Sequence, residues 1–333
     1  MSRRRRHAAV AAAAALALGT PGLAHAGGRG DVDTSGGAGG GNITATAGVK
    51  YDTSKNGTSS DGSPAGPLKP TGNWSPPPCW YQPYYTPAQL KAADESVWSE
   101  DSPGYDWKTR QADYYANGKP YTDFNMAKTG QGYWWYGYTP RENYGLPGAL
   151  SCTDEPFWVD KGDPPPPGHA NAITPQVLAE LAYRQILIPT GRATTNPTTT
   201  QTVNLPTWVW LDRTVFHPVS VTAYLPDYNV SATTTATPVG IHIDPGTPDA
   251  TVFPSSGDCP DTGTAYTPGD RGTPPCGLTY LRATDGGSYP LTVTVTWHIS
   301  WTGTGQPTPV DLPTGTFPHE QPTTVREIQT VDR

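Results

Sequence analysis

The clearest hydrophobic pattern in the chain lies in Tyr289–Trp301. From Leu291 onward every odd position carries a large apolar side chain, and every even position carries a polar one. Successive side chains of a β-strand point to opposite faces, so the alternation predicts a long strand with one face in a core and the other in water. β-Branched and aromatic residues, which favour strands, fill nearly every position.

Shorter runs of the same kind follow residue 201 at intervals marked by turn-forming residues, which is typical of a β-sandwich. Pro245–Pro275 is rich in Pro, Gly and Asp and predicts a long loop between two of these runs. We expect a mainly β protein that ends in a sandwich domain at residues 201–333. Its predicted strands are Leu205–Leu211, Val219–Tyr224, Tyr228–Pro238, Val239–Asp244, Leu278–Arg282, Tyr289–Trp301 and Thr323–Val331.

Two short helices are predicted before the sandwich, at Pro87–Val97 and Pro175–Leu187. Each follows a threonine suited to the N-cap and begins with proline, which fits the first helical position. Gln89 completes a capping box in the first helix. The second helix lies in a Pro-rich spacer at residues 161–200, after the stiff run Pro164–Pro167. One side of this helix is mostly apolar and is expected to dock on the sandwich through Val177, Leu178, Leu181, Ala182 and Gln185.

The chain starts with the features of an export signal. Arg3–Arg6 give a basic start, Ala8–Leu18 an apolar stretch, and Ala24-His25-Ala26 a small-x-small cleavage site. Residues 1–26 are therefore predicted to be a signal peptide cleaved after Ala26. Ordinary secretion is favoured over twin-arginine export, because the apolar residues expected just after the arginine pair are missing. Residues 27–72 are rich in Gly, Ser and Thr and predict a flexible linker with one candidate edge strand at Asn42–Tyr51.

Charge and composition narrow the function classes. Cleavage would remove four arginines and no acid, which takes the formal net charge from −7 to −11. Such an acidic chain disfavours nucleic acid as a partner. The 38 prolines and 37 glycines, with a charged fraction of only 15%, suit an exported β protein with long loops. No window of about 18 consecutive apolar residues follows the leader, so no membrane span is expected and the localisation is secreted, extracellular.

The four cysteines, Cys79, Cys152, Cys259 and Cys276, permit three pairings. An even number in an exported chain favours disulfides. The simplest pairing joins Cys79 to Cys152 and Cys259 to Cys276, with one bridge in each half of the chain. A four-thiolate zinc site needs close cysteine pairs, which the sequence lacks. We expect two disulfides, no metal and no cofactor.

Residues 73–160 form a predicted aromatic-rich domain, and 20 of the chain's 34 aromatic residues lie in Asn73–Trp158. The rings have two interpretations: the core of a small disulfide-closed domain, which is favoured, or a surface that stacks on sugars or anchors a partner. An extended strand hidden on one face would leave some rings of the run at residues 133–138 exposed. The candidate ligand-binding residues are Tyr133, Trp134, Trp135, Tyr136 and Tyr138.

Catalytic chemistry has few candidates. The chain contains none of the G-x-S-x-G, H-E-x-x-H, S-x-x-K or EF-hand patterns. His242 and Asp244 would share one strand face and suit either a metal or an acid–base pair, although a polar strand face explains them equally well. A glycosidase needs two carboxyl groups beside a cleft, one of them with a pKa raised by burial. Glu155, close to Trp158, is the best single candidate, but no catalytic residue is assigned.

Three segments of the second half resemble PKD-type, immunoglobulin-like domains, in which W-D-F-G-D-G precedes H-T-Y and Y-x-V-x-L-x-V. The corresponding segments are Ile243-Asp244-Pro245-Gly246, Leu278-Thr279-Tyr280 and Tyr289–Val295. Ile243 replaces Trp, Pro245 replaces Phe, and Thr247-Pro248 replaces the closing Asp-Gly. The resemblance implies an immunoglobulin-like β-sandwich for the C-terminal domain.

The second half also resembles a group of secreted actinobacterial proteins without known function. The matching segments are Ile173-Thr174-Pro175, Asn204–Trp210, Thr294–Trp297 and Trp301-Thr302-Gly303. Some members of that group are labelled as ATP/GTP-binding. This chain lacks G-x-x-x-x-G-K-[ST], and its Gly118-Lys119 is followed by proline, so no nucleotide is expected.

These observations favour an exported, non-catalytic adhesion, binding or spacer protein. Its aromatic half would contact a cell-wall or extracellular glycan, or a surface protein. The alternative is a secreted polysaccharide hydrolase with its site in the aromatic-rich half.

Overall fold

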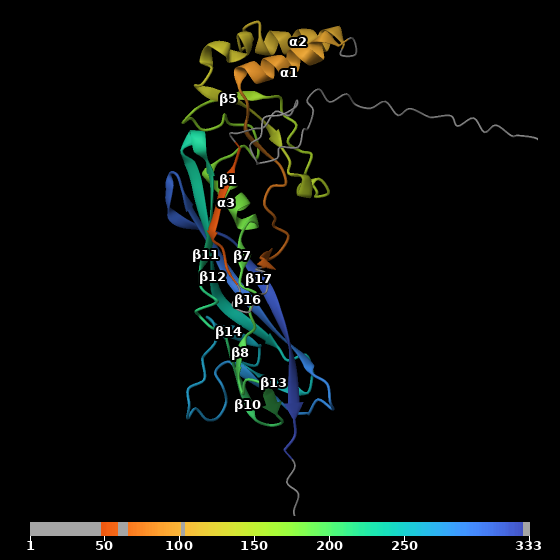
Figure 1. Cartoon of the computed structure of the whole chain (residues 1–333), viewed down its shortest axis with the longest axis vertical. Helices are drawn as coiled ribbons and strands as arrows, with labels where there is room; N and C mark the ends of the chain where they lie inside the picture. Colours follow the sequence, from red (N-terminus) through yellow and green to blue (C-terminus); the bar gives the residue numbers. More distant parts are fainter. Residues whose placement is uncertain (1–47, 59–65, 101–103, 329–333) are drawn as a thin grey trace, which may run out of the picture.

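The computed structural model describes residues 48–58, 66–100 and 104–328. The predicted signal peptide lies outside these residues, as does most of the predicted linker. The described chain is mainly β and elongated, with helices α1 (Pro87–Ser99) and α2 (Tyr105–Tyr115) at one end and a small sheet at the other (Figure 1). Strand β16, Tyr289–Gly303, runs along the middle and confirms the long strand predicted from the alternating pattern.

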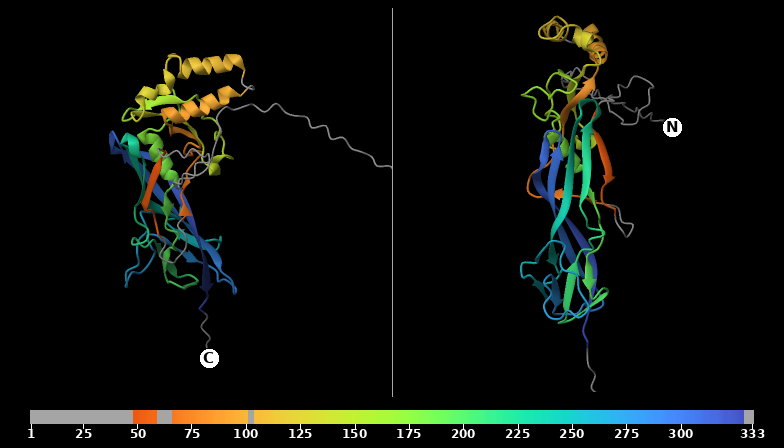
Figure 2. Two further views of the ribbon diagram at one scale, coloured as in Figure 1. Left: turned by 45° about the horizontal axis from the view of Figure 1, so that its top comes forward. Right: turned by 90° about the vertical axis from the view of Figure 1, so that its left-hand side faces the viewer.

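The largest sheet is built around β16. Its order is β1 (Lys50–Lys55), β11 (Val219–Leu225), β12 (Val230–Asp244), β16, β17 (Gln306–Arg326) and β3 (Lys69–Pro70), all antiparallel neighbours. Strand β14 (Asp258–Pro260) pairs with β12, and β9 (Thr200–Thr202) pairs in parallel with β17. The two views in Figure 2 show this sheet as the long, twisted body of the molecule.

Three smaller sheets complete the fold. The sheet at the end opposite α1 and α2 has the order β13 (Ala250–Phe253), β15 (Gly277–Tyr280), β10 (Pro206–Trp210) and β8 (Thr194–Asn196). A two-stranded sheet joins β2 (Gly66–Pro67) to β7 (Leu187–Ile188). The aromatic-rich region holds a three-stranded sheet of β4 (Trp80–Tyr85), β5 (Gly132–Tyr138) and β6 (Phe157–Asp160).

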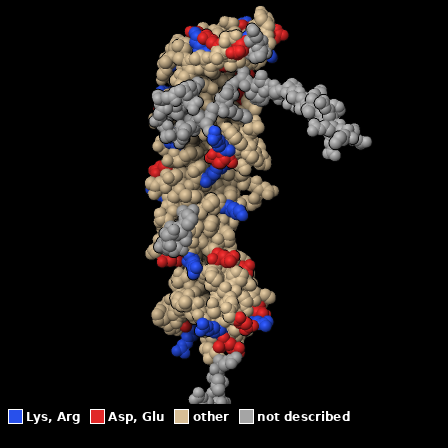
Figure 3. Space-filling model, turned by 45° about the vertical axis from the view of Figure 1, so that its right-hand side comes forward, with Lys and Arg blue, Asp and Glu red and all other residues tan. Residues whose placement is uncertain are grey.

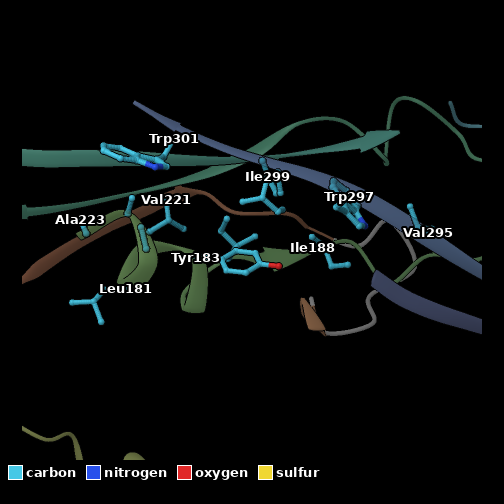
Figure 4. Close-up of a cluster of buried hydrophobic side chains, with 14 of the residues drawn as sticks. Leu181, Tyr183, Ile188, Val221, Ala223, Val295, Trp297, Ile299 and Trp301 are labelled. Atoms are coloured by element: carbon cyan, nitrogen blue, oxygen red, sulfur yellow. The ribbon is translucent and has the colours of Figure 1, made fainter. Parts of the chain in front are cut away.

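The inward face of β16 packs against two different partners. Leu291 and Val293 belong to the same core cluster as Leu278 and Tyr280 of the small sheet, which gives this end a sandwich-like arrangement of two sheets. Farther along the strand the large sheet is covered by helix α3, Pro175–Arg184, which contacts β11, β12 and β16. Figure 4 shows the side chains between them, among them Tyr183, Val221, Ile299 and Trp301.

Both predicted helices are present with their predicted caps. Thr86 and Gln89 form the capping box of α1, and the Thr174 hydroxyl accepts a hydrogen bond from the Val177 amide at the start of α3. Helix α3 ends at Arg184, three residues before the predicted Leu187, which instead lies in β7. Helix α2 was not predicted. Three short 3₁₀ turns complete the helical elements: Asp123–Lys128, Arg141–Asn143 and Pro226–Tyr228.

Several strand boundaries differ from the prediction. The two expected strands on either side of Pro238 are one strand, β12, whose register against β16 shifts between Pro238 and Gly240. A β-bulge at a proline explains the apparent break. Strand β17 starts at Gln306 rather than Thr323, and the predicted loop at 245–275 contains β13 and β14. The range 27–72 assigned to flexible linker also contributes β1, β2 and β3.

Both disulfides have the predicted pairing. Cys79–Cys152 has a Cα–Cα separation of 6.0 Å, and Cys259–Cys276 one of 5.6 Å. Each bridge stays within its own half of the chain. No helix of the described residues is long and apolar enough to cross a membrane.

One core crosses the predicted boundary between the aromatic-rich region and the sandwich. Trp80, Tyr81 and Trp135 are buried in the same cluster as Val221 and Trp297. The 3₁₀ turn between β11 and β12 joins the two parts, because the Trp135 indole donates to the Tyr228 hydroxyl at 3.1 Å, which donates in turn to the Val159 carbonyl at 3.1 Å.

This shared core leads to a prediction about fragments. A chain of residues 173–333 loses β1 and β3 from the large sheet and uncovers the core face that Trp80 and Trp135 pack against. We expect it to melt at least 10 °C below a chain of residues 48–333, since a lost kcal/mol lowers the Tm by roughly 2–4 °C in a protein of this size. Thermal unfolding measures the difference. Equal melting temperatures would show that the halves are independent domains.

Candidate functional site

The two tryptophans of the predicted ligand-binding run are core residues. Trp134 and Trp135 are 0% and 1% exposed, and they point to opposite faces of β5. Trp134 packs under α1 and α2 with Tyr115, Tyr121 and Trp158. Trp135 packs on the other face, in the core shared with the sandwich. At these two positions β5 is thus packed on both faces, by the rings under α1 and α2 on one side and by the shared core on the other.

The three tyrosines of the run are partly exposed and lie in three different places. The Tyr133 hydroxyl donates to the Asp227 carboxylate at 2.9 Å, and the Lys161 ammonium lies 5.2 Å from the centre of its ring. Tyr136 packs against the rings of Tyr84 and Tyr85. Tyr138, at the end of β5, lines a cavity.

Gly137, which interrupts the run of rings, is required by the close approach of another segment. It pairs in register with Tyr81, and the irregularity lies in β4 between Pro83 and Tyr85. A Cβ atom at position 137 would lie 2.4 Å from the Cys152 carbonyl oxygen. Glycine therefore allows the disulfide-linked segment to cross close to β5.

The cavity beside Tyr138 has a volume of about 280 Å³ and lies where β1, β4, the end of β5 and α3 meet. We call it the junction pocket. Its lining combines aromatic rings with polar side chains from distant parts of the chain: Tyr51, Trp80, Gln82, Tyr138, Glu142 and Arg184, with Gly48, Val49, Lys50, Pro140, Leu181 and Gln185 completing the wall. Trp80 and Tyr138 meet edge to face with ring centres 5.3 Å apart.

Hydrogen bonds hold the polar side chains of the junction pocket in place. The Trp80 indole donates to Gln82 Oε1 at 2.8 Å, which fixes the amide on the floor of the pocket. One guanidinium nitrogen of Arg184 donates to the carbonyls of Pro76 and Pro77 at 2.9 and 3.3 Å. These fixed positions mean that a ligand meets a preorganised set of polar groups.

The electrostatics of the junction pocket centre on Arg184. Burial lowers the pKa of this guanidinium, while Tyr51 and Glu142 raise it. Burial also raises the pKa of the Tyr51 hydroxyl, which therefore stays neutral at physiological pH. The pocket thus presents a cation, a carboxylate and a neutral hydroxyl to a polar ligand.

A second hollow lies beside α2. It has a volume of about 330 Å³ and is lined by Trp107, Arg110, Gln111, Tyr114 and Glu155. The Gln111 amide donates to the Glu155 carboxylate at 3.2 Å. We call it the α2 hollow. Glu155, the candidate acid of the sequence analysis, therefore lies beside an open depression.

Asp94 of α1 is the carboxyl group most changed by its surroundings. Its Oδ2 atom is buried and accepts no hydrogen bond from the residues described. Burial, with a smaller contribution from the negative charge of Glu155, raises the pKa of Asp94 to about 7. Asp94 therefore keeps its proton near neutral pH, and it interacts electrostatically with Glu155, an exposed carboxyl group that lines the α2 hollow.

His242 and Asp244 share the exposed face of β12, as predicted, but they make separate contacts. The His242 Nδ1 atom lies 2.8 Å from the Asp258 carboxylate on β14, and the Asp244 carboxylate accepts from the Gly246 amide. His298 forms a similar exposed pair with Asp311. Within the described residues no group of three or more His, Cys, Asp or Glu side chains is placed to hold a metal ion.

Comparison with known proteins gives no family, curated protein or solved structure that matches this chain. The fold and the two cavities therefore stand on their own geometry. Figure 3 shows basic and acidic side chains interspersed among uncharged ones on one face of the molecule, without a continuous stripe of one sign among the residues drawn in colour.

Proposed function

We propose that this protein is an exported, non-catalytic binding protein that holds a sugar unit of a cell-wall or extracellular glycan in the junction pocket. The observation that carries the proposal is the lining of that pocket, where Tyr138 and Trp80 lie beside Gln82, Glu142 and Arg184. Ligand sites combine apolar walls with a few fixed polar groups in this way.

The chemistry of a sugar matches this lining. A pyranose ring has an apolar face of C–H groups, which packs on an aromatic ring, and a rim of hydroxyl groups that both donate and accept hydrogen bonds. Arg184 supplies donors, Glu142 supplies an acceptor, and Gln82 belongs to a residue type that supplies both. The volume of about 280 Å³ suits one or two sugar units rather than a long chain.

The β-rich part would act as a rigid spacer of the PKD-like, immunoglobulin-like kind. Its long strands, sandwich-like end and own disulfide support that role. Secretion is supported by the two disulfides, which persist in oxidising compartments. The resemblance to secreted actinobacterial proteins favours a cell-wall glycan as the first ligand to test.

The test of this function separates binding from stability. Tyr138→Ala and Glu142→Gln should each weaken the affinity for a glycan fragment by roughly tenfold or more, about 1.4 kcal/mol, because the first removes an aromatic wall and the second removes the negative charge and replaces one acceptor oxygen with a donor. Calorimetry with soluble cell-wall oligosaccharides gives the affinity, and circular dichroism gives the melting temperature. Tyr144→Ala, which changes a 46% exposed tyrosine close by in the chain, is the matched control.

An unchanged affinity in both pocket variants would overturn the proposal. Loss of affinity in Tyr144→Ala alone would move the site to the loop that carries that residue. A wild-type protein that binds no glycan fragment, yet binds a purified surface protein through the pocket, would replace the sugar with a protein ligand.

The alternative function, polysaccharide hydrolysis, is favoured by one observation. Asp94 and Glu155 interact electrostatically, and the pKa of Asp94 is raised to about 7 as a general acid requires. Release of reducing ends from insoluble glycans tests it. Hydrolysis that disappears in both Asp94→Asn and Glu155→Gln would establish an enzyme, whereas no release by the wild-type protein leaves binding as the function.

A further inference from the structure

One side of α2 carries two aromatic rings in one line. Trp107 and Tyr114 are seven residues apart, which places them on the same side of the helix with a drift of only about 20°. Both are partly exposed, and both line the α2 hollow. Helix α2 lies at the extreme end of the elongated molecule, where a large ligand can approach it (Figure 1).

The spacing of the two residues along the helix axis matches a repeat length of one class of polysaccharide. Seven residues of α-helix advance about 10.5 Å along the axis, which is close to the length of one disaccharide unit in an extended β-1,4-linked glycan. Successive sugars of such a chain are turned over relative to each other, so every second sugar presents the same face. Rings carried by two residues at this spacing therefore suit equivalent sugar faces of a single chain.

Polar groups fill the space between the rings. Arg110 and Gln111 lie one turn after Trp107, and the Gln111 amide is held against the Glu155 carboxylate. These groups supply donors and an acceptor to the hydroxyls of the sugar that bridges the two stacked units. Tyr114 is held by edge contacts with the rings of Tyr115 and Tyr121, at 4.8 and 5.4 Å between ring centres. Because the side chain is already ordered, binding a ligand costs it little further conformational entropy.

We infer that the α2 hollow is a second glycan site, built for a β-1,4-linked polysaccharide chain lying along the helix from Trp107 to Tyr114. The inference rests on the proposed function, because it assumes that the protein binds glycan, and it adds the linkage and a separate contact surface. The junction pocket takes one or two sugar units, and the α2 hollow takes the length of the polymer.

Sedimentation binding to insoluble polysaccharides tests the inference. The full chain should bind amorphous cellulose and chitin, both β-1,4-linked, at least tenfold more tightly than starch granules (α-1,4) or curdlan (β-1,3). Trp107→Ala and Tyr114→Ala should each lower the affinity for the β-1,4-linked polymers by roughly tenfold, because stacking on one ring is lost. Tyr105→Ala, at an 82% exposed tyrosine on the opposite side of α2, should leave it unchanged.

Because Tyr114 contacts buried rings, Tyr114→Phe distinguishes a stacking role from a structural one. It keeps the ring and should bind as the wild-type protein does. Equal binding to all four polymers, or no effect of Trp107→Ala, overturns the inference. If Tyr138→Ala lowers the affinity for β-1,4 polymers and Trp107→Ala does not, the α2 hollow is not the site and the junction pocket is supported. Binding lost in Trp107→Ala but not in Tyr138→Ala supports the α2 hollow and counts against the junction pocket.

Discussion

Replacing Trp135 with alanine should lower the free energy of unfolding by about 3–5 kcal/mol, the usual cost of removing a fully buried aromatic side chain. The indole is 1% exposed, packs edge to face on Tyr228 with ring centres 5.4 Å apart, and donates to the hydroxyl of that residue. Its removal leaves a cavity between the aromatic-rich region and the sandwich. Chemical denaturation of the variant measures the loss, and 1 kcal/mol or less would contradict the structure.

Trp134→Ala should cost a similar amount but in a different part of the protein. Its indole donates to the Phe124 carbonyl at 3.0 Å and contacts the rings under α1 and α2. We expect the helices to lose protection from hydrogen exchange while the large sheet keeps it, whereas Trp135→Ala should loosen both parts. Tyr105→Ala, at an exposed ring, is the control and should change the stability by less than about 0.5 kcal/mol.

Elements with local signals could be predicted from the sequence. Strand β16 carries the full alternation of a half-buried strand, and α1 and α3 carry their threonine caps and first-position prolines. Helix α2 has neither signal: its N-cap is Gly104, which makes no side-chain capping bond, and Tyr115 is its one fully buried residue. The sequence predicts too short a β17 because this strand contains prolines. A sheet tolerates proline only where the strand lacks a neighbour on one side, and that depends on the rest of the sheet.

The candidate site depended on information that no single stretch contains. Whether β5 faces water is decided by α1 and α2 on one side and by the β11–β12 turn on the other, and both lie far from it in sequence. The junction pocket combines Tyr51, Gln82, Tyr138 and Arg184 from four separate segments. For the α2 hollow the sequence does show two aromatic residues seven positions apart. That spacing places them on one side only if the segment is a helix, and α2 is not predicted from the sequence.

The second large effect concerns pH, and it comes from two buried groups that act in opposite directions. Asp94 has its pKa raised from an ordinary value of 3.8 to about 7, mainly by burial and further by the charge of Glu155, and it also interacts electrostatically with the hydroxyls of Tyr85 and Tyr115. The folded protein keeps this proton up to about pH 7, and the unfolded chain loses it above about pH 4. Stability is therefore lost as the pH rises from about 4 to about 7.

His319 of β17 does the reverse. Burial lowers its pKa from 6.5 to about 4, and its ring packs between Phe216 and Phe317 with Nε2 buried and unpaired among the described residues. The unfolded chain takes up a proton below about pH 6.5 and the folded protein does not. Stability is therefore lost as the pH falls from about 6.5 to about 4, over much of the range in which Asp94 acts.

The two effects cancel between about pH 4.5 and pH 6.5, so the free energy of unfolding of the wild-type protein should depend only weakly on pH there. A variant that lacks one of the two groups should show the pH dependence that the other group causes. Asp94→Asn should raise the stability above pH 7 by up to about 4 kcal/mol, the equivalent of about three pKa units. Its stability should then fall steeply with acid. His319→Leu should produce the opposite slope, with most of its gain in stability below pH 5.

Denaturant unfolding of both variants at pH 4.5, 5.5, 6.5 and 8 measures the slopes, with Glu95→Gln and His217→Leu as exposed controls. Two variants with the same shallow profile as the wild-type protein would show that neither group is buried as the structure places it.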